Sequence, residues 1–75
     1  MNLQEILYEV FDTDTIDIRE EVKIREIENW DSMNHMILIE AIESNYNLTF
    51  TGEQIANIET IKDIKTYLYE KGFSE

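Results

Sequence analysis

Ser32 is the residue of this sequence that is best placed to do chemistry. It stands between Asp31 and Met33, where a long loop ends and a strongly helical run begins. A helix N-terminus presents unpaired N–H groups and a partial positive charge, which would stabilise a phosphate ester on the Ser32 hydroxyl. Asp and Ser are also common at helix starts simply as caps, and the local sequence alone favours that simpler explanation for Asp31 and Ser32.

His35 is the one residue that could serve Ser32 as a catalytic base. It lies three residues further on, a spacing at which helical side chains can meet. However, the sequence offers no obvious acid to orient His35 and no glycine-rich oxyanion loop. We therefore expect that the protein is not an enzyme and that His35 is a solvated side chain.

Metal chemistry is suggested by Asp12, Asp14 and Asp17, whose spacing is close to that of calcium ligands. An EF-hand loop starting at Asp12 would need Gly at its sixth position and Glu at its twelfth, where this chain has Asp17 and Lys23. We interpret these aspartates as turn-capping or solvated residues and predict no metal site. Cysteine is absent, so any thiol chemistry must come from an added group.

A first helix and a long loop precede Ser32. After Asn2, a plausible N-cap, apolar residues recur at i, i+3, i+4, i+7 and i+8 and predict one buried helix face: Leu3, Ile6, Leu7, Val10 and Phe11. From Asp12 to Trp30 the periodicity is lost, which predicts a long connection with a helical turn near Arg19 to Val22. Spaced apolar residues should hold this loop to the core: Ile16, Ile18, Val22, Ile24, Ile27 and Trp30.

Three further helices are predicted from Asp31 onward. The second runs to about Tyr46, and its core-facing stripe is Leu38, Ile39, Ile42 and Tyr46. Capping boxes at Thr51–Gln54 and Thr60–Asp63 predict a short third helix and a last helix that ends at Gly72. The predicted fold is therefore all-α, a small four-helix bundle with a long first loop, in a single domain over residues 1–75.

Charge restricts the possible partners. Seventeen acidic residues against six basic ones give a formal net charge of −11 over 75 residues. This charge repels nucleic acid and anionic membranes and attracts basic protein surfaces, although it also keeps a small protein soluble. No segment is apolar enough to span a bilayer or to act as a secretory signal. We expect a cytoplasmic monomer that binds neither nucleic acid nor membrane.

The predicted second helix is apolar on two faces. Met33, Ile37 and Ala41 are spaced at i, i+4 and i+8, away from the core stripe. A chain this short cannot cover both faces, so the second face should stay exposed as a docking patch. Glu40 and Glu43 add negative charge, which would suit a partner with an apolar centre and a basic rim.

Two adjacent segments resemble the phosphopantetheine-attachment motif and recognition helix of acyl carrier proteins: Trp30-Asp31-Ser32-Met33-Asn34-His35-Met36 and Leu38-Ile39-Glu40-Ala41-Ile42-Glu43. The Asp-Ser-Met motif is short, but the resemblance extends over nearly the whole predicted order of helices. It implies that a phosphopantetheinyl transferase attaches 4′-phosphopantetheine to Ser32, which makes the chain a phosphoprotein, and that Asp31 assists this modification. The arm's terminal thiol would carry acyl or aminoacyl groups as thioesters between enzymes with basic surfaces.

The same resemblance implies roles for two further groups of residues. Met33, Met36, Ile37, Glu40 and Glu43 would contact partner enzymes. The space that shelters an acyl chain would be lined by Met36, Ile39, Ile42, Tyr46, Phe50, Ile55, Ile58, Ile64 and Leu68. These residues are also expected to form the core, and the bulk of Tyr46, Ile55 and Ile64 predicts a short or polar cargo.

The pathway is not readable from the residues. Asn34 and Ile37 stand where the main fatty-acid carriers usually present acidic residues, so the chain resembles stand-alone carriers of specialised pathways, such as polyketide, surface-polysaccharide or aminoacyl-transfer systems. Fatty-acid biosynthesis stays open as well. The alternative is an acidic adaptor without a prosthetic group, which would dock a basic protein partner through the second helix.

Overall fold

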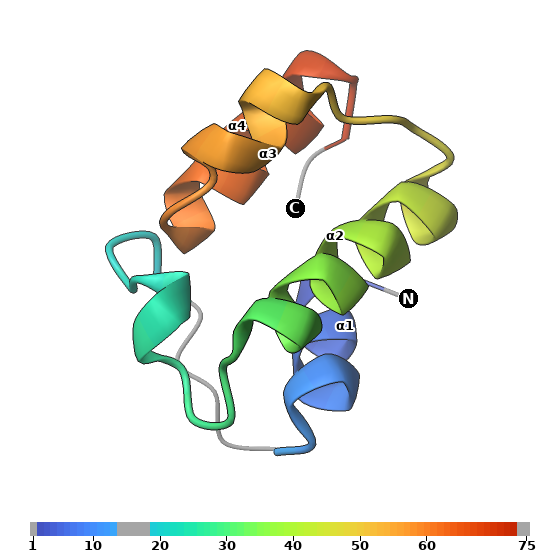
Figure 1. Ribbon diagram of the computed structural model, residues 1–75. Helices are drawn as coiled ribbons and strands as arrows, with labels where there is room; N and C mark the ends of the chain where they lie inside the picture. The colour runs from blue at the N-terminus through green and yellow to red at the C-terminus, as the bar shows by residue number, and fades with distance from the viewer. Residues whose placement is uncertain (1, 14–18, 74–75) are drawn as a thin grey trace.

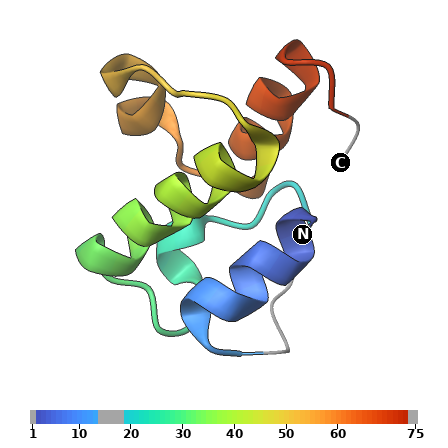
Figure 2. The ribbon, with the colours of Figure 1, turned by 90° about the vertical axis from the view of Figure 1, so that its right-hand side faces the viewer.

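The computed structural model describes residues 2–13 and 19–73. Within these residues the chain forms four α-helices, one short 3-10 helix and no strand: α1 (Leu3–Phe11), η1 (Ile24–Glu26), α2 (Ser32–Tyr46), α3 (Gly52–Asn57) and α4 (Ile61–Glu70). Helices α1 and α2 lie side by side, and α3 and α4 lie on the opposite side of the bundle (Figure 1, Figure 2). The predicted all-α bundle with a long first loop and a short third helix is confirmed.

The starts of the helices are set by side chains that accept backbone hydrogen bonds. Reciprocal capping boxes open three helices and pair Asn2 with Glu5, Thr51 with Gln54, and Thr60 with Asp63. Each box satisfies two N–H groups that have no partner inside the helix. The predicted caps at these three positions are confirmed.

The end of α4 is closed by a Schellman motif. Gly72 has a φ of 97°, a region that favours glycine, and its N–H donates to the Tyr69 carbonyl at 3.0 Å. The next N–H, of Phe73, donates to the Leu68 carbonyl at 2.9 Å. The Phe73 ring then packs edge-on against Tyr46, with ring centroids 4.9 Å apart, so the end of α4 is joined to α2.

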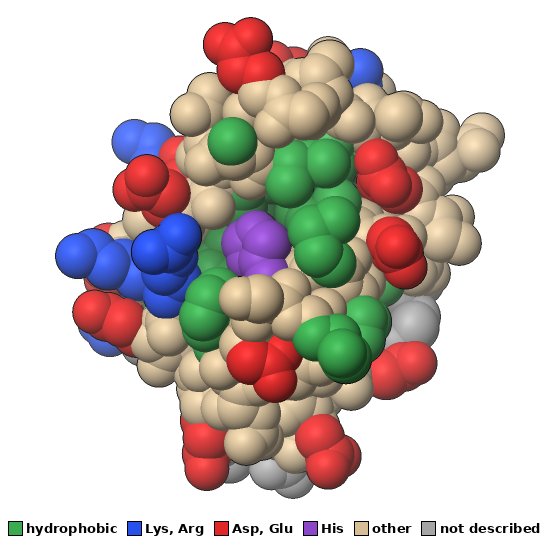
Figure 3. Space-filling view, in the orientation of Figure 1, with side chains coloured by type: hydrophobic (Ala, Val, Ile, Leu, Met, Phe, Trp, Pro, Cys, Tyr) green, Lys and Arg blue, Asp and Glu red, His purple; other side chains and the backbone are tan. Residues whose placement is uncertain are grey.

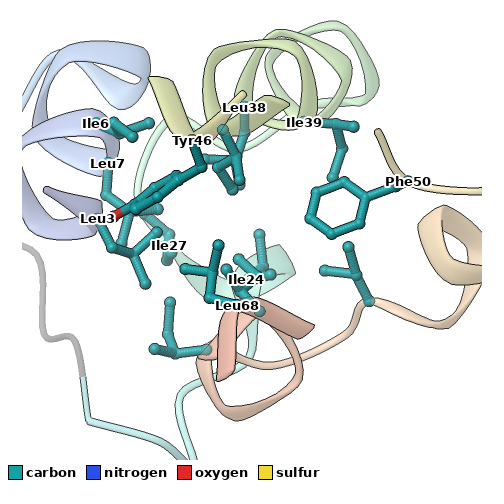
Figure 4. Packing of buried hydrophobic residues seen from close by; sticks show 14 of the residues in the cluster. Leu3, Ile6, Leu7, Ile24, Ile27, Leu38, Ile39, Tyr46, Phe50 and Leu68 are labelled. Carbon is teal, nitrogen blue, oxygen red and sulfur yellow. The ribbon is translucent and has the colours of Figure 1, made fainter. Parts of the chain in front are cut away.

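The core lies between the two helix pairs and the loop (Figure 4). The predicted stripe of α2 is buried throughout, and in α1 only Val10 is merely half-buried. Buried residues from α1, α2, α4 and the connecting segments meet there: Leu3, Ile6, Leu7, Phe11, Ile24, Ile27, Leu38, Ile39, Ile42, Tyr46, Phe50, Ile58, Ile61, Ile64 and Leu68. Burial of this apolar surface is the main force that stabilises so small a domain.

The long loop differs from its prediction in one respect. A helical turn was expected near Arg19 to Val22. The structure has no helix there, only a single non-helical turn in which the Val22 N–H donates to the Arg19 carbonyl at 3.1 Å. The helical segment is η1, a few residues later. Residues three apart lie on the same side of a 3-10 helix, so η1 directs Ile24 and Ile27 into the core together. Val22 and Trp30 pack against the core half-buried, whereas Ile16 and Ile18 lie outside the described residues.

Backbone hydrogen bonds fasten the second half of the loop to the start of α4. The Ile24 N–H donates to the Glu59 carbonyl at 2.9 Å, and the Ile61 N–H donates to the Val22 carbonyl at 3.0 Å. Lys23 and Thr60 form an isolated antiparallel bridge at the same place. The loop before Ser32 is thus positioned by a helix that lies far along the chain.

Asp63 should make the stability of the protein depend on pH. Partial burial raises the pKa of this carboxyl, but hydrogen bonds from the Glu59 and Thr60 N–H groups and from the Thr60 hydroxyl, together with the charge of Lys62, outweigh burial and lower the pKa. A depressed folded-state pKa stabilises the fold above the unfolded-state pKa, and this contribution is lost as the pH falls through the folded-state value.

We therefore expect the substitution Asp63→Asn to lower the free energy of unfolding by about 0.5–1 kcal/mol at neutral pH, allowing for solvent screening of a half-buried carboxylate. Urea denaturation of both chains from neutral to acid pH should show the difference between them shrinking on acidification. A difference that stays constant over this range would contradict the assignment.

Candidate functional site

Ser32 is the first residue of α2 and is exposed. Asp31 precedes it in an extended conformation and caps the helix, its Oδ1 accepting the Asn34 N–H at 2.7 Å. The Asn34 side chain donates in turn to the Asn29 carbonyl at 3.0 Å, which ties the helix start to the loop. Within the described chain the Ser32 hydroxyl has no hydrogen-bond partner, so it is presented to solvent by a well-anchored helix end.

A depression of about 340 Å³ opens beside Ser32, between α2, α3 and the loop. Its apolar side is formed by Met36, Ala56, Ile55 and Ile58, and its polar side carries the positive charge of Arg25 and the negative charge of Glu59. Its lining is Arg25, Trp30, Ser32, His35, Met36, Ile55, Ala56, Ile58 and Glu59. In Figure 3 the single histidine lies between a gathering of Lys and Arg side chains and hydrophobic side chains on this face.

Three side chains in contact with one another line the polar side of this depression, and Trp30 is the central one. Its indole Nε1–H donates to His35 Nδ1 at 3.3 Å, and the two rings meet edge-on with centroids 6.1 Å apart. The Arg25 guanidinium carbon lies 5.8 Å from the centroid of the Trp30 ring, within the range of a cation–π contact. We call Arg25, Trp30 and His35 the aromatic wall.

The hydrogen bond from Trp30 determines the tautomer of His35. Because Nδ1 accepts, the proton of the neutral imidazole must lie on Nε2. Burial lowers the pKa of His35, and the positive charge of Arg25 lowers it further. The prediction of a solvated histidine is wrong, because the ring is half-buried and engaged by Trp30, and the lowered pKa favours its neutral form.

The effect of Arg25 on His35 can be measured directly. We expect the substitution Arg25→Gln to raise the pKa of His35, because it removes a positive charge that disfavours the imidazolium. His35 is the only histidine of the chain, so its ring resonances in an NMR titration need no assignment by mutation. Lys71→Gln removes the same charge outside the depression and is the matched control; equal pKa values for parent and Arg25→Gln would contradict the prediction.

The residues predicted to contact partners lie on the surface of α2, with one exception. Met33 is 73% exposed, Met36 47% and Ile37 43%, and Glu40 is exposed as well. Glu43 is half-buried, and its carboxylate accepts the Phe50 N–H at 2.8 Å. Glu43 therefore fastens the segment between α2 and α3 to α2, and its predicted partner contact stays a prediction.

Ala41 belongs to a second depression rather than to an open patch. It is half-buried between α1 and α2, in a hollow of about 320 Å³ lined by Ile6, Glu9, Val10, Ile37, Ala41 and Asn45. Ile37 borders this hollow, while Met36 lines the one beside Ser32. The apolar surface of α2 is thus divided between two hollows.

Most residues predicted to shelter an acyl chain are packed into the core. Ile39, Phe50, Ile64 and Leu68 are at most 4% exposed, as is Ile42, and Tyr46 is 9% exposed. Of the predicted set, the depression beside Ser32 is lined by Met36, Ile55 and Ile58. Whether the others make room for a cargo stays a prediction.

Sequence reasoning did not associate Arg25, Ala56 and Glu59 with the site, and it placed Trp30 in the motif without predicting its contact with His35. Arg25 and Glu59 follow no periodic pattern, because they lie in η1 and in the segment between α3 and α4. The five-residue separation of Trp30 and His35 crosses the start of α2, where helical spacing rules do not apply. A lone tryptophan directly before the cap was the available signal.

The described residues hold neither a cluster of metal ligands nor a membrane-spanning helix. In residues 2–13 and 19–73, no three or more His, Cys, Asp or Glu side chains are grouped so as to hold a metal ion. Asp14 and Asp17 lie outside these ranges. Over the same ranges, no helix has both the length and the apolar character needed to cross a membrane.

Comparisons with known proteins support the fold. No protein-family model and no curated protein sequence matches this chain. A solved structure described as a putative acyl carrier protein from Mycobacterium tuberculosis is similar to it, with a TM-score of 0.81 over 93% of this chain and 99% of that one. The two sequences are 19% identical. At that identity the likeness establishes an acyl-carrier-like fold for this chain.

Proposed function

We propose that this chain is an acyl carrier protein, modified with 4′-phosphopantetheine on Ser32 by a phosphopantetheinyl transferase. The observation that carries the proposal is the exposed, unengaged Ser32 hydroxyl at the first residue of α2, in a fold similar to that of an acyl carrier protein. The chain itself catalyses no reaction in this role. Its task is to present an attached group to other enzymes.

The residues around Ser32 fit a phosphopantetheine group. The phosphodiester would lie at the positive end of a 15-residue helix, where N–H groups of the first turn lack internal partners. In the modification, Ser32 Oγ forms a bond to the phosphopantetheine phosphorus of coenzyme A, the pyrophosphate bond breaks, 3′,5′-adenosine bisphosphate leaves, and the hydroxyl proton passes to a base of the transferase. Asp31 would assist by holding the helix start in place beside the reacting hydroxyl.

The bound group would supply a thiol that carries acyl or aminoacyl groups as thioesters, which a chain without cysteine cannot provide itself. The depression beside Ser32 lies at the small end of the range for ligand pockets, and a filled core closes it from below. With charged and aromatic side chains on one side, it favours a short or polar cargo over a long alkyl chain. Such a cargo suits a specialised biosynthetic pathway.

Partner enzymes would dock on α2 beside Ser32. Met33 and Ile37 supply exposed apolar surface there, and Glu40 supplies negative charge on the same helix. Together with the net charge of −11, this surface suits transferases and acyl-loading enzymes that present basic residues around an apolar centre.

The proposal is tested by incubating the chain with coenzyme A, magnesium and a broad-specificity phosphopantetheinyl transferase. We expect the intact mass to rise by one phosphopantetheinyl group, and peptide mapping to place it on the segment that contains Ser32. Incubation without transferase is the control. If the folded chain gains no mass, the adaptor alternative takes precedence, in which α2 docks a basic partner without any prosthetic group.

A further inference from the structure

We propose that the aromatic wall holds the phosphodiester of the arm on Ser32, with His35 donating a hydrogen bond from Nε2 and Arg25 supplying positive charge. This inference rests on the proposed function. It assigns a ligand to two polar side chains, Arg25 and His35, that neither cap α2 nor belong to the core, and to the Trp30 ring that both of them contact.

The direction of the hydrogen bond from Trp30 leaves one nitrogen of His35 free to donate. His35 Nδ1 is occupied by the Trp30 indole, so the free donor of the neutral ring is Nε2–H. Within the described chain no oxygen accepts a hydrogen bond from Nε2. A half-buried donor gains stability when it finds an acceptor, and the wall of a depression that also contains Ser32 is where that acceptor would be.

His35 lies close enough to Ser32 to contact a phosphate attached there. The phosphorus would be bonded to Ser32 Oγ itself, so the other phosphate oxygens would lie only two bonds away from Ser32 Oγ. Residues three apart on a helix have Cβ atoms about 5–6 Å apart, which brings His35 within reach of a group attached to Ser32. Both side chains line the same depression.

Arg25 brings a positive charge to the same depression. Arg25 lies against the Trp30 ring, and in the described chain it forms no ion pair, although acidic residues outnumber basic ones seventeen to six. Lys23 lines the neighbouring hollow together with Arg25 and Glu59. A guanidinium matches the geometry of phosphate oxygens, so Arg25 is suited to bind a phosphodiester. Glu59 is the single acidic side chain that lines the depression.

Contact between the phosphodiester and the aromatic wall would set the direction in which the phosphopantetheine arm leaves Ser32. A phosphodiester held against the aromatic wall would start the arm along the depression between α2 and α3 instead of outward into solvent. The apolar side of the depression, at Met36, Ile55 and Ile58, would then face the rest of the arm. The wall would bias the arm towards a sheltered position between visits to partner enzymes.

The test compares the unmodified and the fully loaded chain by NMR, with intact mass confirming complete loading. In the loaded chain we expect the His35 Nε2–H to exchange more slowly and give a resolved cross peak, and the pKa of His35 to rise, because the phosphodiester charge favours the imidazolium. Arg25 and Glu59 are the other charged groups lining the depression, and both are present in the two states compared.

Two variants separate a specific contact from long-range attraction. The ³¹P resonance of the loaded parent should follow the titration of His35, and His35→Gln should abolish this pH dependence. Arg25→Gln, an exposed change that leaves the core untouched, should make the Nε2–H exchange faster than in the loaded Lys71→Gln control. A fully loaded chain whose Nε2–H stays unprotected would overturn the inference even if its pKa rises, whereas a failure to load at all would overturn the proposed function instead.

Discussion

Replacing Ser32 by alanine is expected to abolish attachment of phosphopantetheine and to leave the fold intact. The hydroxyl is exposed, and no described residue bonds to it, so its removal should change the free energy of unfolding by less than about 0.5 kcal/mol. The loss of modification should be complete, because the hydroxyl oxygen is the atom that forms the new bond. Intact mass after incubation with coenzyme A and transferase measures this loss, and far-UV circular dichroism checks the fold.

Ser44 provides the matched control for this experiment. It lies on the same helix, is exposed, and carries the same hydroxyl. The variant Ser44→Ala should be modified as fully as the parent chain. If Ser32→Ala still gains a phosphopantetheinyl group, the group is attached elsewhere and the assignment of Ser32 is wrong.

The second large effect is expected for the core side of α2. Leu38 is fully buried, and Leu38→Ala should lower the free energy of unfolding by about 2–5 kcal/mol, because it removes buried apolar surface and leaves a cavity. A core of this size rarely supplies more than about 3–5 kcal/mol of net stability, so the variant should be largely unfolded at room temperature. Urea denaturation followed by circular dichroism measures the difference.

Ile37 is the control for Leu38, because it is the preceding residue on the same helix and its side chain is 43% exposed. Ile37→Ala should cost less than about 1 kcal/mol, and its effect should appear mainly in encounters with partner enzymes. Equal destabilisation by the two substitutions would show that α2 does not face the core as described.

Local signals in the sequence were enough to predict the helices. Stripes at helical spacing identified the buried faces of α1 and α2, and the caps at Asn2, Asp31, Thr51 and Thr60 identified four helix starts. These signals work because a cap or a stripe depends on residues three or four apart. They require no knowledge of the rest of the chain.

The parts that sequence reasoning missed depend on residues far apart. The position of η1 follows from burial of Ile24 and Ile27 and from bonds to the segment before α4, which no local pattern announces. The neutral, engaged state of His35 depends on where the Trp30 ring lies, and that is decided by the loop. Ser32 could be predicted as the attachment site because its motif is local, whereas the aromatic wall beside it depends on the loop and could not be predicted.

The same distinction separates the predicted sheltering residues. Several of them were assigned by resemblance, and in this chain they fill the core; Ile42, Ile64 and Leu68 are fully buried. Ile55 in α3 and Ile58 directly after it line the depression, although Ile58 also belongs to the core. Which apolar residues line a hollow is a property of helix placement, which periodicity alone does not determine.

The bonds between the loop and the start of α4 also bear on the order of folding. Helix α2 and the cap at Asp31 depend on nearby residues and can form early, but the segment that carries Arg25 is held in place by contacts with Glu59 and Thr60. Contacts between residues so distant in the chain form late, since the loop they close costs entropy. The depression beside Ser32 therefore exists only once α4 has packed against the loop, which makes a finished depression a sign of a completed fold.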